Sequence, residues 1–365
     1  MLLPYIPQDI LEIIIGYATA DGPYDFSTLS LVSHTFRQIV LPYKLRSLTF
    51  RHSNTTFTCS FTGAPIFRLF TVPNFCEALN AGDAHALSLA PLVQELNLLQ
   101  WSSGRCHIMK YPMQKPFQEI VNSVISFRNL TKLSMENCVI SPIIMELLGK
   151  LVQLQTLRTL SCEPAEYNDK ISFGALANLH SLHTLECANN SIELKHDLAC
   201  IPMKKLRILK SNDLEVIEAL LTTDPPVQLK ELWLTYRFSG DYSLLWNYLA
   251  RVTSLTHLSL PNLHLPDGTP SLIFHFRKLQ YLHIHVAFAP HFANQPMRKM
   301  KINTGNTLGE DMVDVVRRHW QGTVFPHVEY LEMDQCLGLI PIEFWREFLT
   351  KVKMCQCNDH IVVFC

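Results

Sequence analysis

The chain is poor in charged residues and has almost no excess of either sign. Charged residues make up 17% of the 365 residues, and 31 Lys and Arg against 32 Asp and Glu give a net charge of -1. Without a basic field to hold phosphates, general nucleic-acid binding is not expected. No apolar run approaches the roughly 18 residues that a membrane-spanning helix needs, so no membrane partner is expected either.

The sequence also lacks the motifs of common catalytic sites. It has no G-x-S-x-G nucleophile elbow, no Gly-rich phosphate loop and no H-E-x-x-H metal helix. Its last four residues do not form a lipidation box. We therefore predict that the chain is not an enzyme by itself and holds no cofactor.

The cysteines give little support for a disulfide framework. There are eleven, an odd number, and Cys138, Cys162 and Cys187 fall at interior positions of a sequence repeat, where a small buried thiol fits. This pattern suits a reducing compartment and predicts a cytoplasmic or nuclear protein. Residues 1–20 imitate a signal peptide only weakly, because no basic residue precedes the apolar run and Asp9 and Glu12 interrupt it. A secreted receptor is the alternative, and it would require paired cysteines.

Two groups of residues contain possible metal ligands. Cys355, Cys357, His360 and Cys365 lie close in sequence but lack C-x-x-C spacing, and we expect ordinary buried thiols in a capping strand. His283 and His285 share one strand face without a third ligand nearby in the sequence. No metal site is predicted.

A leucine spacing recurs along most of the chain. Its form is L-x-x-L-x-L, as in Leu255 to Leu260, followed by a small or apolar residue. Units of this form begin at Leu130, Leu154, Leu182, Leu206, Leu229, Leu255, Leu279, Met297 and Val328. Most steps match the 20–29 residues of a leucine-rich repeat. We predict an α/β leucine-rich-repeat solenoid with short parallel strands on the concave face and helices on the convex face.

The repeat is less regular before residue 128. One unit consists of Leu45, Leu48 and Phe50, and the next consists of Val93, Leu96 and Leu98. The second unit begins at twice the usual interval after the first. A degenerate repeat or an insertion lies between them, and the sequence does not choose. Helices are expected at 77–79 and 84–89, interrupted by Gly82, and at 114–127, with Phe117, Ile120, Val121, Val124 and Ile125 on one face.

Helical segments are also expected after later strands. Ser141 followed by Pro142 indicates a helix start, and Gly149 its end. Further helices are predicted at 213–221, 242–252, 309–320 and 341–352.

Strand alternation selects the residues of the exposed face. The leucines of L-x-L point into the core, and the residues between and beside them point outward. Aromatic residues among charges are typical of interaction surfaces. The predicted substrate-binding residues are therefore Glu231, Trp233, Tyr281, His283, His285, Tyr330 and Glu332. The alternative is that the aromatic rings pack only against neighbouring repeats.

Residues 1–45 predict a small all-α unit. Apolar residues recur at helical spacing from Pro7 to Tyr17 and again from Phe26 to Val40, with Asp21-Gly22-Pro23 between. Such a helical pair could simply cap the open end of a solenoid.

The same residues resemble an F-box. Ile6-Pro7-Gln8-Asp9-Ile10-Leu11-Glu12-Ile13-Ile14 is similar to its opening L-P-x-E-I-L-x-x-I, and residues 29–39 to its second half, L-S-L-V-C/S-x-x-W/F-R-x-I. The resemblance implies the substrate receptor of a Skp-cullin-F-box ubiquitin ligase. Residues implied to contact the Skp adaptor are Ile6, Pro7, Ile10, Leu11, Ile14, Leu31, Val32 and Phe36. The expected organisation is an F-box-like unit at 1–45, irregular repeats at 46–127 and a regular solenoid with a C-terminal cap at 128–365.

Overall fold

A computed structural model describes a large part of the chain: residues 41–42, 45–51, 72–101, 115–164, 178–188, 205–212, 226–234, 243–261, 276–304, 312–334, 337, 340–357 and 360–363. The chain forms two compact units. The first contains residues 1–182 and 190–195, and the second contains 183–189 and 196–365. The predicted helices at 7–17, 26–40 and 213–221 lie outside the described residues.

The first unit contains a parallel sheet built from the early repeats. Its strands are β1 (Ser47–Arg51), β2 (Glu95–Leu99), β3 (Lys132–Glu136) and β5 (Thr156–Leu160), paired in that order. The first leucine of each L-x-L motif is in register with its neighbour, from Leu48 to Leu96, Leu133 and Leu157. These leucines are at most 2% exposed, which confirms the predicted inward position.

Direct pairing of β1 with β2 decides the question left open by the sequence. No further repeat strand lies between them in the sheet, so the doubled interval is an insertion. It contains α4 (Val72–Asn80), α5 (Ala84–Leu89) and the 3-10 helix η2 (Ala90–Leu92). Gly82 separates α4 from α5 at φ +76°, a conformation that glycine adopts without strain. Since β2 also pairs with β3, the sheet continues across the predicted boundary at 127/128, which falls inside the first unit.

The other helices of the first unit pack their apolar side inward. They are α6 (Lys115–Ser123), the 3-10 helix η3 (Val124–Ser126) and α7 (Pro142–Leu148), and two short strands, β4 (Val139–Ile140) and β6 (Glu163–Pro164), form a second small sheet. Ile125 was predicted to be buried but is 44% exposed, because the tighter winding of η3 turns it outward. Ser141 caps α7 as predicted, accepting a hydrogen bond from the Ile144 amide at 3.3 Å.

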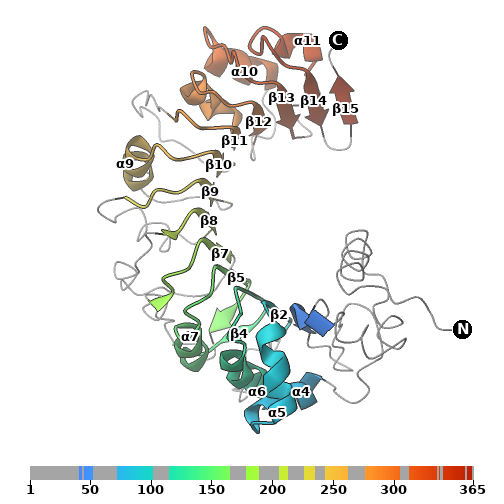
Figure 1. The fold of residues 1–365 in the computed structure, drawn as a ribbon. Helices are drawn as coiled ribbons and strands as arrows, with labels where there is room; N and C mark the ends of the chain where they lie inside the picture. Colours follow the sequence, from blue (N-terminus) through green and yellow to red (C-terminus); the bar gives the residue numbers. More distant parts are fainter. Residues whose placement is uncertain are drawn as a thin grey trace, which may run out of the picture. The chain divides into compact units, whose positions relative to one another are not determined.

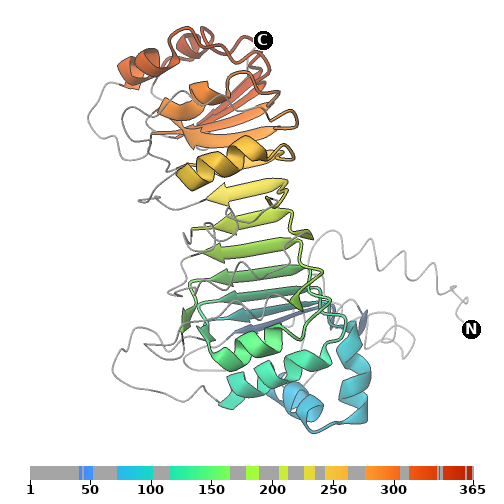
Figure 2. The same ribbon diagram turned by 90° about the vertical axis from the view of Figure 1, so that its left-hand side faces the viewer.

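Among the described residues, the second unit contains eight parallel strands and one antiparallel strand. In pairing order they are β7 (Thr184–Ala188), β8 (Ile208–Ser211), β9 (Glu231–Leu234), β10 (His257–Leu260), β11 (Tyr281–His285), β12 (Lys299–Asn303), β13 (Tyr330–Met333), β14 (Met354–Cys357) and the antiparallel β15 (His360–Val363). Figures 1 and 2 show them side by side. Their inward residues form one buried row from Leu185 to Cys355.

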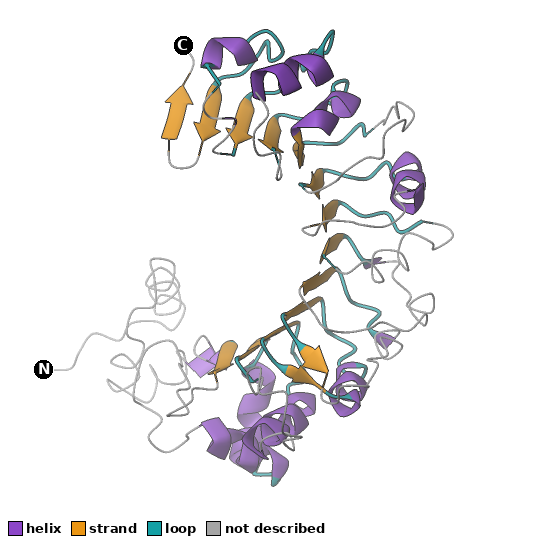
Figure 3. Cartoon of the chain, turned by 180° about the vertical axis from the view of Figure 1, so that it is seen from behind, coloured by secondary structure: helices purple, strands orange, loops and turns teal. Residues whose placement is uncertain are grey.

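Helical segments lie on one side of these strands (Figure 3). They are α9 (Ser243–Arg251), the 3-10 helix η7 (Val286–Phe292), α10 (Met312–Trp320) and α11 (Ile342–Trp345). Trp320 is fully buried and its indole donates a 2.7 Å hydrogen bond to the Val286 carbonyl, which ties α10 to η7. The helix predicted at 341–352 is shorter than expected: α11 ends at Trp345, and turns follow. The described part of each unit is an α/β leucine-rich-repeat solenoid, as the repeat predicted.

Candidate functional site

The exposed side of the sheet in the second unit is the candidate site. Each strand from β8 to β13 presents two residues that alternate with the buried leucines, and the strand register aligns them in two rows. The first row is Ile208, Glu231, His257, Tyr281, Lys299 and Tyr330, and the second is Lys210, Trp233, Ser259, His283, Lys301 and Glu332. We call these two rows the strand face.

Aromatic rings and lysines form a continuous run across the strand face. The ammonium group of Lys210 lies 5.4 Å from the centre of the Trp233 ring, which stacks on Tyr281 at 5.4 Å. Lys299 follows, 5.7 Å from the Tyr281 ring and 5.6 Å from the Tyr330 ring. Such contacts are attractive because the face of an aromatic ring carries negative potential. These five residues, the aromatic–lysine run, connect β8 to β13.

The middle strand of this run supplies small or flat side chains. Ser259 of β10 is 2% exposed, which leaves room above it for Trp233 and Tyr281 to meet. The His257 ring stacks beside Trp233 at 6.4 Å. Ser259 lies between Leu258 and Leu260, where the alternation predicts an exposed side chain, but its hydroxyl is covered and hydrogen-bonded to Nδ1 of His283 at 3.0 Å. The rings are therefore held in place by their neighbours.

Charges within the strand face are partly paired. Glu332 forms ion pairs with Lys299, at 3.6 Å, and with Lys301. Burial opposes ionisation of Glu332, but the hydrogen bond and positive charge of Lys301, with the charge of Lys299, outweigh it and lower its pKa. Glu231 accepts a 3.1 Å hydrogen bond from the Trp233 indole. Both carboxylates hold elements of the aromatic–lysine run in position.

Two side chains on this face have pKa values displaced from the ordinary range. Burial and the nearby Lys301 ammonium lower the pKa of His283 to about 4, so the imidazole is neutral at neutral pH. Burial and the negative charge of Glu332 raise the pKa of Tyr281 to about 12. Both effects follow from partial removal of these groups from water. Of the groups on this face, His283 and Tyr281 therefore stay neutral near pH 7.

Six of the seven predicted substrate-binding residues lie on the strand face: Glu231, Trp233, Tyr281, His283, Tyr330 and Glu332. His285 does not, because it is only 5% exposed. Its Nε2 lies 2.8 Å from the Thr304 carbonyl, and its Nδ1 accepts a hydrogen bond from the Ala287 amide. The prediction failed because η7 begins directly after β11 and covers the last outward position of that strand.

Lys210, Lys299 and Lys301 were not among the predicted site residues. The signal that identifies them is the strand register, because it places Lys210 beside Trp233 and Lys299 between two tyrosines.

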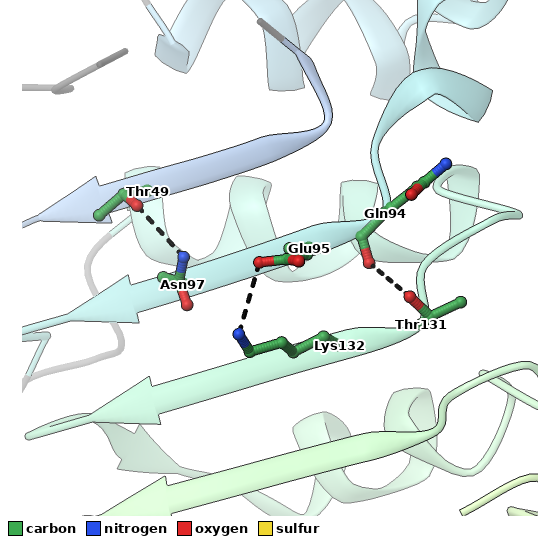
Figure 4. Close-up of polar contacts among 6 residues, drawn as sticks. All are labelled: Thr49, Gln94, Glu95, Asn97, Thr131 and Lys132. Carbon is green, nitrogen blue, oxygen red and sulfur yellow. Dashed lines mark hydrogen bonds and ion pairs between the residues drawn. The ribbon is translucent and has the colours of Figure 1, made fainter. Parts of the chain in front are cut away.

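The first unit has a different exposed side. The outward positions of β1, β2, β3 and β5 contain no aromatic residue. Figure 4 shows their polar contacts: Asn97 donates to the Thr49 hydroxyl at 3.3 Å, Thr131 to the Gln94 carbonyl at 3.2 Å, and Lys132 pairs with Glu95 at 3.5 Å. Exposed ion pairs of this kind contribute little energy. Aromatic anchors are therefore a property of the second unit's strand face.

The remaining predictions concern the adaptor-binding residues and the cysteines near the end of the sequence. All predicted adaptor-binding residues, from Ile6 to Phe36, lie outside the described residues. Cys355 is buried, and the Cys357 thiol donates to the Asp334 carbonyl at 3.4 Å. Within the part of the chain that the structure describes, no three His, Cys, Asp or Glu side chains are grouped to hold a metal ion. No described helix is long and apolar enough to cross a membrane.

Comparison with known proteins does not identify a family. No family model matches the chain. No curated protein matches it. Among solved structures, it is similar to an internalin, InlF, from Listeria monocytogenes str. 4b F2365, with 16% sequence identity and a TM-score of 0.29. That match covers 61% of this chain and 58% of the internalin, less than two thirds of its length.

Proposed function

We propose that this protein is the substrate-recognition subunit of a Skp-cullin-F-box ubiquitin ligase. Residues 1–45 would bind the Skp adaptor, and through it a cullin, and the repeats would bind a protein substrate. The observation that carries the proposal is the order of motifs: residues 6–14 and 29–39 resemble both halves of an F-box, and repeat units follow at once. The strand face supports the second half, because it offers aromatic rings and charges to a partner.

In this function the chain performs no chemistry of its own. Its contribution to the rate is proximity, because it would hold a substrate lysine near a ubiquitin-carrying enzyme bound to the same assembly. This requires neither a cofactor nor a metal. It also places the protein in the cytoplasm or nucleus, where the other subunits of such ligases act.

The adaptor contact is tested by co-purification of the full-length chain with a Skp adaptor. We expect the intact protein to capture the adaptor, and the double substitution Ile10→Asp and Leu11→Asp to abolish capture, because charges would replace an apolar contact. Trp233→Ala is the matched control and should capture the adaptor normally. If the intact, folded protein does not associate with the adaptor, the ligase proposal is wrong.

The second candidate is a scaffold or inhibitor whose N-terminal helices only cap the solenoid. One observation favours it: among the described strands, β1 pairs only with β2 and is the first strand of its sheet, and solenoid ends need a cover. In that case the double substitution should lower the melting temperature. A double variant that no longer captures the adaptor but has the same melting temperature as the intact protein supports the ligase-receptor proposal over the cap.

A further inference from the structure

Lysines outnumber glutamates by one on the strand face, and Glu186 of β7 lies in register with Lys210 at its border. Its two rows contain Lys210, Lys299 and Lys301 against Glu231 and Glu332. Glu332 is shared between two lysines. Of the three lysines, Lys210 has its ammonium over the Trp233 ring and no carboxylate partner among the described ion pairs.

A basic row crosses the same sheet at the N-terminal ends of its strands. Residues that immediately precede the strands are linked in register by backbone hydrogen bonds, and they include Arg207, Lys230, Arg298 and Lys353 against Glu329. Lys353 pairs with Glu329 at 3.1 Å, which leaves the row basic overall. On a chain whose net charge is -1, the row of residues that precedes these strands is therefore basic, and the strand face itself is close to neutral.

The distance between the two end lysines of the aromatic–lysine run matches the length of a short extended peptide. Lys210 is on β8 and Lys299 on β12, four strand steps apart in the sheet. At about 4.8 Å per step, the two positions are about 19 Å apart, and an extended chain at about 3.3 Å per residue spans that distance with about six residues. Between them lie the stacked rings of Trp233 and Tyr281. The surface thus alternates positive, aromatic and positive over the length of a short peptide.

We infer that the strand face binds an extended acidic protein segment that crosses the strands from β8 to β12. Carboxylates at its two ends contact Lys210 and Lys299, and apolar side chains between them stack on Trp233 and Tyr281. This inference names the substrate class of the proposed receptor and in that sense rests on the proposed function. The binding itself needs only the second unit's strand face.

Single-stranded nucleic acid would also use lysines and aromatic rings, but the arrangement favours a peptide. Glu231 and Glu332 lie within the rows, beside Trp233 and Lys301. A phosphate at every step of the ligand would meet these carboxylates, whereas a peptide places its carboxylates apart and can present neutral groups there. Charge complementarity thus selects separated acidic side chains.

The test is fluorescence anisotropy with the full-length protein and a labelled peptide. The probe has two aspartate pairs separated by five residues, two of them phenylalanine, and the comparison probe has asparagine in place of every aspartate. We expect the aspartate peptide to bind at least about tenfold more tightly, and its affinity to fall as salt is added. Equal binding of the two peptides would overturn the inference.

Variants then locate the site. Lys210→Met with Lys299→Met should weaken aspartate-peptide binding about tenfold, and Trp233→Ala should weaken both peptides. Methionine keeps the length of the lysine stem and introduces no new charge, and a melting curve verifies that each variant is folded. Arg318→Met, on the exposed surface of α10, removes a positive charge elsewhere in the unit and should leave affinity unchanged. Equal losses for Arg318→Met and the double variant would also overturn the inference.

Two further measurements separate this inference from neighbouring ones. If an oligothymidylate binds more tightly than the aspartate peptide and displaces it, the face is a nucleic-acid site and the inference is wrong. Ile10→Asp with Leu11→Asp should leave peptide binding unchanged. Peptide binding without adaptor capture would refute the ligase proposal alone, and adaptor capture without peptide binding would refute this inference alone.

Discussion

His283 shows how the strand face fixes the state of a single side chain. Its ring is half-buried between β10 and β12, with Nδ1 hydrogen-bonded to the Ser259 hydroxyl and the charged groups of Lys301 and Glu332 nearby. Burial and Lys301 disfavour the imidazolium, and Glu332 offsets them only in part. The histidine is therefore a neutral spacer between a serine and a lysine at physiological pH.

This placement predicts a specific pH dependence of stability. The pKa of His283 is about 4 in the folded chain and about 6.5 when unfolded, so the unfolded chain binds more protons between these values. The free energy of unfolding should be fully retained above about pH 6.5 and fall by up to about 3 kcal/mol as the pH drops to about 4. Urea unfolding at several pH values measures it. His283→Gln should lose less stability over this window, and a variant with the wild-type slope would contradict the assignment.

At the scale of elements, the strands could be predicted and their surroundings only in part. The L-x-L spacing located each described strand of the large sheet up to β13, because an apolar residue that must be buried in each repeat fixes both register and face, but it did not locate the short strands β4 and β6. Contacts between distant residues decide which side chains η7 covers and where α11 ends. The predicted exposure of His285 and the predicted length of the helix at 341–352 were therefore wrong. Alternation predicted that the aromatic residues of the site, and Lys299 and Lys301, point outward. The position of Lys210 beside Trp233 and of Lys299 between two tyrosines required knowledge of which strands are neighbours.

The helix cap at the N-terminus of α7 allows a quantitative prediction of stability. Ser141 accepts a hydrogen bond from the Ile144 amide, and Pro142 occupies the first turn, where no amide hydrogen is needed. Ser141→Ala should lower the free energy of unfolding by about 1 kcal/mol, whereas Ser141→Gly should cost only a few tenths. Denaturant titration of the two variants measures the difference. If alanine and glycine cost the same, the side-chain cap contributes nothing to α7.

At the scale of the whole molecule, stability is expected to be distributed along each sheet. Among the described strands of the second unit, each strand from β8 to β14 hydrogen-bonds only to the strand before it and the strand after it in the sheet. In such a stack, stability is close to a sum of repeat terms and nearest-neighbour interfaces. The aromatic–lysine run depends on several consecutive interfaces, because its members come from β8, β9, β11, β12 and β13.

A cavity in one repeat should therefore weaken the second unit locally. Leu258 of β10 is fully buried between Leu232 and Leu282, and Leu258→Ala should cost about 2–5 kcal/mol. Hydrogen–deuterium exchange should show the largest loss of protection in β9, β10 and β11, and Leu331→Ala on β13 should move that loss to β12, β13 and β14. Because β10 underlies the contact between Trp233 and Tyr281, Leu258→Ala should also weaken acidic-peptide binding more than Leu331→Ala does. A uniform loss of protection in both variants would mean that the unit unfolds as one cooperative body rather than as stacked repeats.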